Sequence, residues 1–188
     1  MGNPFKKIES GDKKVWITQP KEIEKILKRK EIALKIAKGK MIDNGGKIET
    51  AMQTAEAFGR GLFEELLKDE SIEWTMDKWL EPVIKNIFNP MGTGATFTNI
   101  SNDKAKSYIF SYGQSNEETD DRIATLFNYG FLRGIFRSAF PNGELILENS
   151  MVDGAQMDEF IFKANAVESD RLEREKIKND YISKKILS

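Results

Sequence analysis

The chain has 188 residues, enough for one domain with a sizeable buried core, and its charge is nearly balanced at a formal net −1. It contains neither cysteine nor histidine, which excludes zinc fingers, iron–sulfur clusters, thiol nucleophiles, haem bound through an axial histidine and histidine-dependent catalytic triads. A chain without cysteine suits a reducing compartment, and no apolar leader opens the sequence, so we expect a cytoplasmic location.

The charge is unevenly distributed along the chain. Residues 1–50 carry a net charge of +6, whereas residues 51–165 carry −8. A basic segment of this kind is found in nucleic-acid-binding arms, but also in ordinary lysine-rich surface helices, and we predict no nucleic-acid partner. Charges interrupt every apolar run, so no membrane span is predicted. The abundance of Lys, Glu and Ile is typical of thermophilic, including archaeal, proteins.

The first part of the chain, residues 1–46, is predicted to form a segment of its own. Residues 1–12 have the polarity of a loose terminus, and residues 15–17 form a short apolar stretch that is either a strand or an anchor. From Pro20 to about Lys38 the pattern predicts a basic amphipathic helix that ends before Gly39. Its apolar stripe consists of Ile23, Ile26, Leu27, Ala33, Leu34 and Ala37. Such a helix lies either on a membrane surface or over a protein core with its lysine stems stretched along it, and we favour the core.

A second helix is predicted from about Lys47 to Lys68, after the turn at residues 44–46. Its apolar residues recur at alternating spacings of four and three, which marks one packed seam. The seam comprises Ile48, Met52, Ala55, Gly59, Leu62 and Leu66. Gly59 and Gly61 lie inside this helix, where glycine permits close approach of another element.

Residues 73–89 are predicted to be helical and strongly apolar. Thr75 is a candidate cap, and Pro82 should kink or restart the helix because proline lacks the backbone donor. Two short helices meeting at Pro82 could wall a cavity, with Trp79 at the wall, or simply contribute to the core. Two strands are predicted next, at residues 94–100 and 105–112, and their short connection implies antiparallel pairing. The glycines at residues 92 and 94 do not have phosphate-loop spacing.

The next helix is predicted to begin at Ser115, because Ser115 and Glu118 fit a capping box. Ile123, Phe127, Phe131 and Ile135 mark its buried face. Gly130 and Gly134 lie on one side of it, which indicates that a sheet, a second helix or a flat ligand packs close to its backbone, and we expect a sheet. After the turn at residues 141–143, two alternating segments joined by Asp153-Gly154 predict a β-hairpin over residues 144–164.

Several features of this region resemble the 4-vinyl reductase (vinyl-4-reductase) domain family, a group of small-molecule-binding, hydrocarbon-binding domains distantly similar to subunits of the TRAPP transport complex. They are Tyr129-Gly130-Phe131 with Gly134, the strand that ends in Glu148, Gly154, and the Glu159-Phe160 strand. The resemblance covers roughly residues 50–165, so residues 47–165 are expected to form the ligand-binding domain. Zinc-binding members have cysteines at the positions of Met151 and Asp158, so here the resemblance implies no metal, and we predict no other cofactor.

The predicted fold class is α+β, with a helical N-terminal half packed on an antiparallel sheet of four or more strands, and a C-terminal helix over residues 166–188. The resemblance implies a hydrophobic ligand, and aromatic residues on elements that should face one another are the candidate lining. They are Trp79, Phe97, Phe110, Phe127, Phe131 and Phe160. We expect non-catalytic binding of this ligand, in a sensory or regulatory role, by a homodimer.

Two alternatives remain open. One is an interaction or scaffold dimer similar to TRAPP subunits, in which the two end helices are the candidate contacts. The other is an enzyme related to tetrapyrrole vinyl reductases, in which Tyr112 or Tyr129 could donate a proton. The enzyme is less favoured, because the sequence contains no nucleotide-binding fingerprint and no haem or cluster ligand.

Overall fold

The computed structural model describes residues 6–10, 13–113, 121–165 and 176. The centre of the fold is a six-stranded antiparallel sheet with strand order β1-β2-β3-β4-β6-β5. Its strands are β1 (Lys6–Ser10), β2 (Lys13–Ile17), β3 (Thr93–Ser101), β4 (Lys104–Tyr112), β5 (Glu144–Asn149) and β6 (Asp158–Lys163). The α+β class, the antiparallel sheet and the hairpin of β5 and β6 are therefore confirmed.

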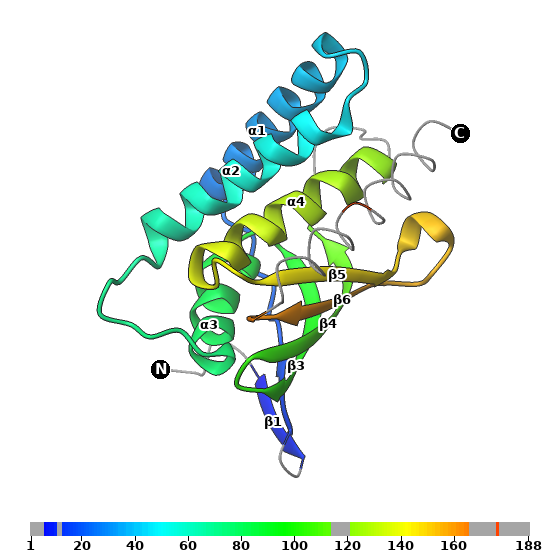
Figure 1. Ribbon diagram of the computed structural model, residues 1–188. Helices are drawn as coiled ribbons and strands as arrows, with labels where there is room; N and C mark the ends of the chain where they lie inside the picture. Colours follow the sequence, from blue (N-terminus) through cyan, green and yellow to red (C-terminus); the bar gives the residue numbers. More distant parts are fainter. Residues whose placement is uncertain (1–5, 11–12, 114–120, 166–175, 177–188) are drawn as a thin grey trace.

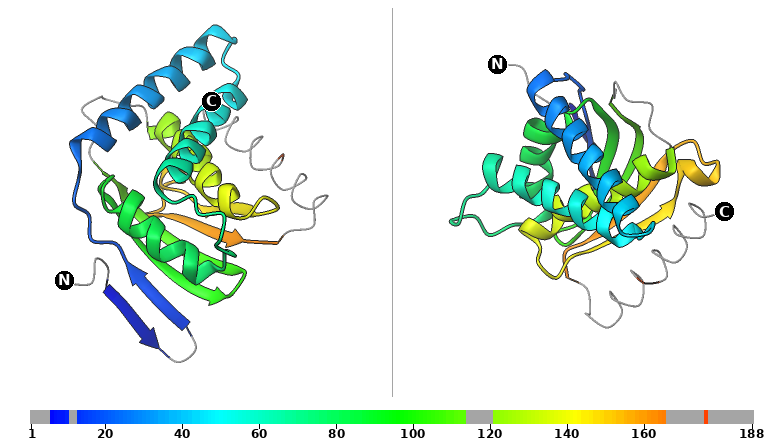
Figure 2. Two further views of the ribbon diagram at one scale, coloured as in Figure 1. Left: turned by 90° about the vertical axis from the view of Figure 1, so that its left-hand side faces the viewer. Right: turned by 90° about the horizontal axis from the view of Figure 1, so that it is seen from above.

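The helices cover one face of this sheet in successive layers (Figure 1). They are α1 (Glu24–Asp43), α2 (Ile48–Leu66), α3 (Met76–Val83), which runs on into a π-helix at Ile84–Phe88, and α4 (Asp121–Ala139). α4 lies between the sheet and α2, and α1 is the outermost layer on α2, as the views in Figure 2 also show. Residues 125–136 of α4 are all buried, because this helix has protein on both sides.

The N-terminal segment departs from the prediction in three ways. Lys6–Ser10 is an edge strand rather than a loose terminus, because it pairs with β2 in a hairpin. α1 continues through Gly39 to Asp43, so this glycine does not end the helix; the turn follows at Gly45 and Gly46, which both have positive φ. Ile23, assigned to the buried stripe, is 48% exposed.

The glycines of α4 are covered by a helix and not by the sheet. A Cβ built on Gly130 would lie 2.7 Å from the carbonyl oxygen of Met52, and one built on Gly134 would lie 2.2 Å from that of Glu56. In the opposite direction, a Cβ on Gly59 would lie 2.3 Å from the carbonyl oxygen of Phe131. The backbones of α2 and α4 therefore touch, and glycine is required at all three positions. Gly61, by contrast, has open space around it.

The segment around Pro82 changes its helical pitch instead of breaking. The Thr75 side chain caps α3 by accepting from the backbone N–H of Lys78, as predicted. Two residues after Pro82, at Ile84, the chain adopts a π-helix, a wider turn that occurs mostly as a single-turn bulge within α-helices. The side chain of Asn86 donates to the carbonyl oxygen of Pro82 at 2.9 Å.

Two predictions concern residues outside the described part of the chain. They are the capping box at Ser115 and, apart from Lys176, the helix over residues 166–188. Among the residues that the structure describes, no helix is long and apolar enough to cross a membrane.

Candidate functional site

The structure divides the six candidate lining residues into three groups. Trp79, Phe97 and Phe160 lie in the core between the sheet and its helices, where each is fully buried. Phe127 and Phe131 lie between α4 and α2, and Phe110 lies on the surface. Only the first group remains a candidate binding site on the sheet.

One row of inward-facing residues crosses five strands and forms the floor of this site. The register aligns Trp16 of β2 with Phe97 of β3, Phe97 with Ser107 of β4, Ser107 with Phe160 of β6, and Phe160 with Leu147 of β5. All five side chains are buried. Ser107, the small polar residue, therefore stands at the centre of a row of large apolar ones.

Trp79 of α3 packs above the floor against aromatic residues that were not predicted to line the site. Its ring centroid lies 5.2 Å from that of Phe136, 6.3 Å from that of Phe140 and 5.4 Å from that of Phe162. Phe162 in turn lies 6.3 Å from Phe97. The space that Trp79 was expected to line is thus filled by other rings, which pack edge-on or tilted, as aromatic side chains prefer.

Phe127 and Phe131 belong to a separate contact on the other side of α4. Their ring centroids lie 6.1 and 5.5 Å from that of Phe58 on α2. The two phenylalanines flank the glycine contact and strengthen the α2–α4 interface. Among the described residues, their ring contacts are with Phe58 and not with the rings of the floor.

Phe110 corrects the prediction for β4. Its side chain is 54% exposed, whereas Ser107 and Ile109 are fully buried. The inner face of β4 is the face of its smaller residues, because the rings of β3, β6 and α4 occupy the space above it. Phe110 packs instead over Gly94, where a Cβ would lie 2.5 Å from its ring.

Two polar atoms in the aromatic core have no hydrogen-bond partner among the residues that the structure describes. They are Nε1 of Trp79 and Oγ of Ser107, on two residues with no exposed surface. A buried polar group without a partner costs about 1–3 kcal/mol relative to one that is satisfied. Natural proteins retain few such groups, and each calls for an explanation, such as a ligand or an ordered water.

The two positions at which the vinyl reductase pattern has cysteines lie side by side. The backbone N–H of Met151 donates to Oδ1 of Asp158 at 2.7 Å, and the hydroxyl of Tyr112 donates to Oδ2 at 2.6 Å. Burial and the neighbouring Asp158 carboxylate raise the pKa of Tyr112 well above its usual value. Tyr129, the other candidate proton donor, donates to the carbonyl oxygen of Leu145 at 3.0 Å. Both hydroxyl groups are therefore engaged in holding the fold together.

In the described residues, no group of three or more His, Cys, Asp or Glu side chains is placed to hold a metal ion. The carboxylate of Asp158 already accepts the two hydrogen bonds described above.

A pattern in the sequence of α4 indicates the aromatic residues that were not predicted to line the site. Leu126, Phe127, Tyr129, Phe131, Leu132, Ile135 and Phe136 place apolar side chains all round α4. A helix that is apolar on every side is buried on every side. We selected only the stripe of Ile123, Phe127, Phe131 and Ile135, and so overlooked Phe136, which contacts Trp79. Ser107 carried no such signal, because a serine in a strand is usually exposed.

A comparison of the chain with protein-family models, with curated proteins and with solved structures finds no match in any of the three.

Proposed function

We propose that this protein binds a small hydrophobic ligand carrying one polar group in the aromatic core beneath α3 and α4, without catalysis. The observation that carries the proposal is that Trp79 Nε1 and Ser107 Oγ have no partner among the described residues, in a core otherwise formed by apolar side chains, many of them aromatic. An indole N–H needs an acceptor, and a hydroxyl group can donate or accept. A ligand with a carbonyl, ether or hydroxyl group would satisfy one or both atoms while its apolar part replaced ring–ring contacts.

Two further features support this proposal. Specific small-molecule sites are mostly apolar and contain a few polar groups that orient the ligand, which is the composition of this core. The resemblance to the vinyl reductase domain family implies a ligand of the same class.

The test begins with native mass spectrometry of freshly purified protein, compared with the same sample after denaturation. A small organic mass present only in the native sample would identify the ligand. The identified compound, or 1-naphthol if none is retained, is then titrated against the protein while tryptophan fluorescence is recorded.

The variants for this titration are Ser107→Ala and Trp79→Phe, with Phe110→Ser as the control. Ser107→Ala removes the hydroxyl without adding volume to the core, so it should weaken binding by about tenfold, the effect of one hydrogen bond. Phe110→Ser changes an exposed ring on β4 and should leave the affinity unchanged. No retained mass together with no saturable fluorescence change would refute the proposal.

A second candidate function, a self-associating interaction domain in the manner of TRAPP subunits, is favoured by the outer surface of α1. Ile32, Ile36 and Ile42 are 58%, 47% and 70% exposed on this helix. Ile32 and Ile36 are one turn apart, so they form a continuous apolar strip. A homodimer formed through this strip is our proposed assembly, and the cytoplasm, which suits a chain without cysteine, is its proposed location.

Sedimentation equilibrium of Ile32→Lys with Ile36→Lys tests the homodimer. The double variant should be monomeric, whereas Ile100→Lys, at an exposed isoleucine of β3 outside this strip, should behave as the parent protein. A parent protein that is monomeric at all concentrations would contradict this assembly without affecting the ligand proposal.

A further inference from the structure

The outer face of α1 combines exposed apolar and exposed basic side chains. α1 is the outermost layer of the helices, with its inner face on α2 (Figure 2). On its outer side Ile32 and Ile36 are 58% and 47% exposed. The lysines around them are also exposed, and they are Lys25, Lys28, Lys35 and Lys40. Because residues three or four apart lie on the same side of a helix, these six residues form one surface, which we call the α1 face.

The charge of α1 is strongly one-sided. Residues 24–43 contain seven Lys or Arg and three Asp or Glu, a net charge of +4. Two further carboxylates act on these cations from outside the helix. Glu65 lies 2.8 Å from Nη2 of Arg29, and Glu22 interacts with the charge of Lys30. Even with each of these five carboxylates set against one cation, two positive charges remain among the described residues.

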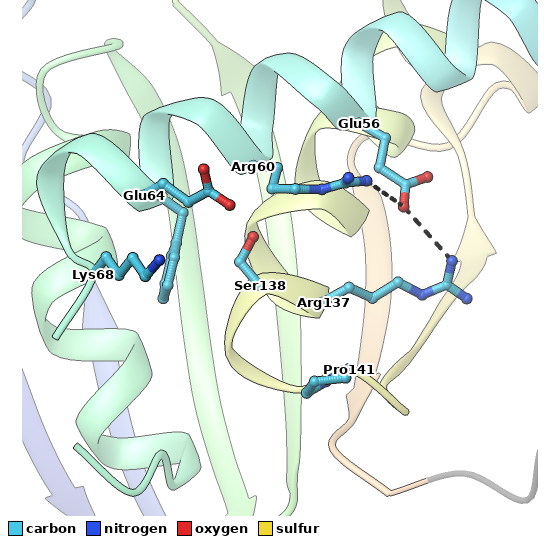
Figure 3. A pocket seen from close by; sticks show the side chains of 8 residues that line it. Glu56, Arg60, Glu64, Lys68, Arg137, Ser138 and Pro141 are labelled. Atoms are coloured by element: carbon cyan, nitrogen blue, oxygen red, sulfur yellow. Dashed lines mark ion pairs between the residues drawn. The ribbon is translucent and has the colours of Figure 1, made fainter. Parts of the chain in front are cut away.

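The arginines on the inner side of α2 are arranged differently, because they are directed at a carboxylate. Nε of Arg133 donates to Oε2 of Glu56 at 2.8 Å. Oε1 of Glu56 lies 3.7 Å from Nη2 of Arg60 and 3.8 Å from Nη1 of Arg137, and Figure 3 shows both guanidinium groups pointing toward it. Arg133 and Arg137 thereby link α4 to α2. The lysines of the α1 face instead surround exposed isoleucines.

A lipid surface fits both properties of the α1 face. Basic amphipathic helices bind membranes by placing lysines near anionic headgroups and apolar side chains at the boundary of the acyl chains. Lysine stems lie along the apolar side chains while the ammonium groups stay at the level of the headgroups. A nucleic acid would offer phosphates but no apolar region for Ile32 and Ile36. A second copy would offer an apolar region, but its equal positive charge would weaken the contact.

We propose that the α1 face docks on the surface of a membrane that contains anionic phospholipids. Ile32 and Ile36 enter the boundary between headgroups and acyl chains, and the lysines of the α1 face contact lipid phosphates. The protein lies on the bilayer through one helix. This contact uses the same isoleucines as the homodimer, so membrane binding and self-association compete. It does not depend on the ligand proposed for the aromatic core.

The first experiment is flotation of the full chain with two kinds of vesicle. One contains phosphatidylcholine alone, and the other contains equal parts of phosphatidylcholine and phosphatidylglycerol. The variant is Lys25→Gln with Lys28→Gln. The matched control is Lys78→Gln with Lys85→Gln, which removes the same charge from exposed lysines of α3 and the π-helix. All four side chains are exposed, so both variants should keep the fold, which circular dichroism checks.

We expect the parent chain to float only with the anionic vesicles and to be released as the salt concentration rises. Each lysine near an anionic surface strengthens binding about fivefold, so the variant should bind about 25-fold more weakly and the control as the parent does. The variant keeps both isoleucines and should self-associate at least as tightly as the parent in sedimentation. The proposal is overturned if the parent does not float, floats equally with both vesicles, or is weakened equally by both double substitutions. A parent that dimerises without floating would assign the α1 face to a second copy.

A second experiment tests whether the isoleucines enter the bilayer. Because the chain contains no cysteine, Ile36→Cys supplies a single attachment point for a nitrobenzoxadiazole dye, whose emission reports the polarity around it. Glu81→Cys, at an exposed residue of α3, is the control. Anionic vesicles should shift the emission at residue 36 to shorter wavelength and leave that at residue 81 unchanged. An equal response at the two positions, or none at residue 36 in a protein that floats, would overturn docking through the α1 face.

Discussion

α2 contacts a helix on each of two sides, and the two contacts are built differently. On the inner side Gly59 faces the backbone of α4 at Phe131, while Gly130 and Gly134 of α4 face the backbone of α2. The two backbones therefore touch, and Glu56 and Arg133 pair in a shielded position. On the outer side α1 contributes only small or medium side chains to the core, namely Ala33, Leu34 and Ala37. The ion pair there, Arg29 with Glu65, is 34% and 53% exposed.

The difference shows which layer the fold depends on. Backbone contact leaves no side chain that could adjust, so α2 and α4 must behave as one rigid unit above the sheet. α1 rests on this unit through side chains that can adjust, and its outer surface exposes isoleucines. We therefore expect substitutions on the inner side of α2 to affect global stability, and those on the outer side to act mildly or on association.

The largest effect is expected from Gly59→Ala. The added methyl would overlap the carbonyl oxygen of Phe131, and relief requires the helices to separate, so we expect a loss of about 3 kcal/mol in the free energy of unfolding. Gly61→Ala, two residues away in open space, should gain up to about 1 kcal/mol from helix propensity. Urea denaturation measures both variants. Equal effects of the two would show that α2 and α4 are not in backbone contact.

A smaller loss is expected from Glu56→Gln. The substitution leaves Arg133, only 9% exposed, without its carboxylate, and the cost should be about 2 kcal/mol, below that of a fully buried pair because both side chains keep some contact with water. Glu65→Gln, which breaks the exposed pair with Arg29 on the other side of α2, should leave the urea midpoint unchanged. The inner pair would be no stronger than the outer one if both variants unfolded at the same midpoint.

The contact of α1 with the sheet should be sensitive to pH. Burial lowers the pKa of Lys30 to about 8, an effect that nearby Glu22 only partly offsets, while its Nζ donates to the carbonyl oxygen of Tyr112 at 2.8 Å. Between pH 8 and 10 the unfolded chain keeps a proton that the folded lysine has lost, so stability should rise with pH. Above pH 10 the raised pKa of Tyr112 reverses the sign, because the unfolded tyrosine ionises first.

Lys30→Met tests this pH dependence. Thermal melts between pH 7 and 10 should show a rising midpoint for the parent chain and a flatter profile for the variant. Lys28→Met, two residues earlier on a side chain that pairs with Glu24 at the surface, is the control and should keep the parent profile. A parent midpoint that falls between pH 8 and 10 would mean that Lys30 remains charged in the fold.

The smallest effect is expected from Gly39→Ala in α1. No atom of the described residues lies within 4 Å of the position that its Cβ would occupy, so the substitution should stabilise the helix by less than about 1 kcal/mol. Calorimetry measures the gain and sedimentation checks the assembly. A loss of self-association would show that this side of α1 packs closely on a second copy.

The strand and hairpin predictions succeeded where local pattern decides structure. Alternation and the turn at Gly154 were enough to place β5 and β6, and the seam of α2 was read correctly from Ile48 to Leu62. Gly130 and Gly134 indicated close packing of a backbone, which is a local requirement. Their partner was predicted wrongly, because a glycine leaves the same space for a helix as for a sheet.

The candidate site was predicted only in part, because the sequence does not state which face of a strand is covered. In β4 the aromatic face looked like the inner one, but Phe110 is outside and Ser107 is inside. Side chains from several elements fill the same space above the sheet, so large rings on β3, β6 and α4 leave room only for a small residue on β4. That compensation joins residues far apart in the chain and is visible only once they are packed together.

By itself, the sequence determined the class of the fold, most of its helices and strands, the need for glycine at the tight positions, and the exclusion of chemistry that requires cysteine or histidine. These depend on period, backbone freedom and side-chain chemistry, which are properties of short segments. Only the tertiary structure decided that α4 lies between the sheet and α2, that Trp79 and Ser107 bury unpartnered polar atoms, and that Arg60 and Arg137 converge on one carboxylate. The reason is that burial and charge balance depend on neighbours, and here the neighbours are supplied by segments distant in the sequence.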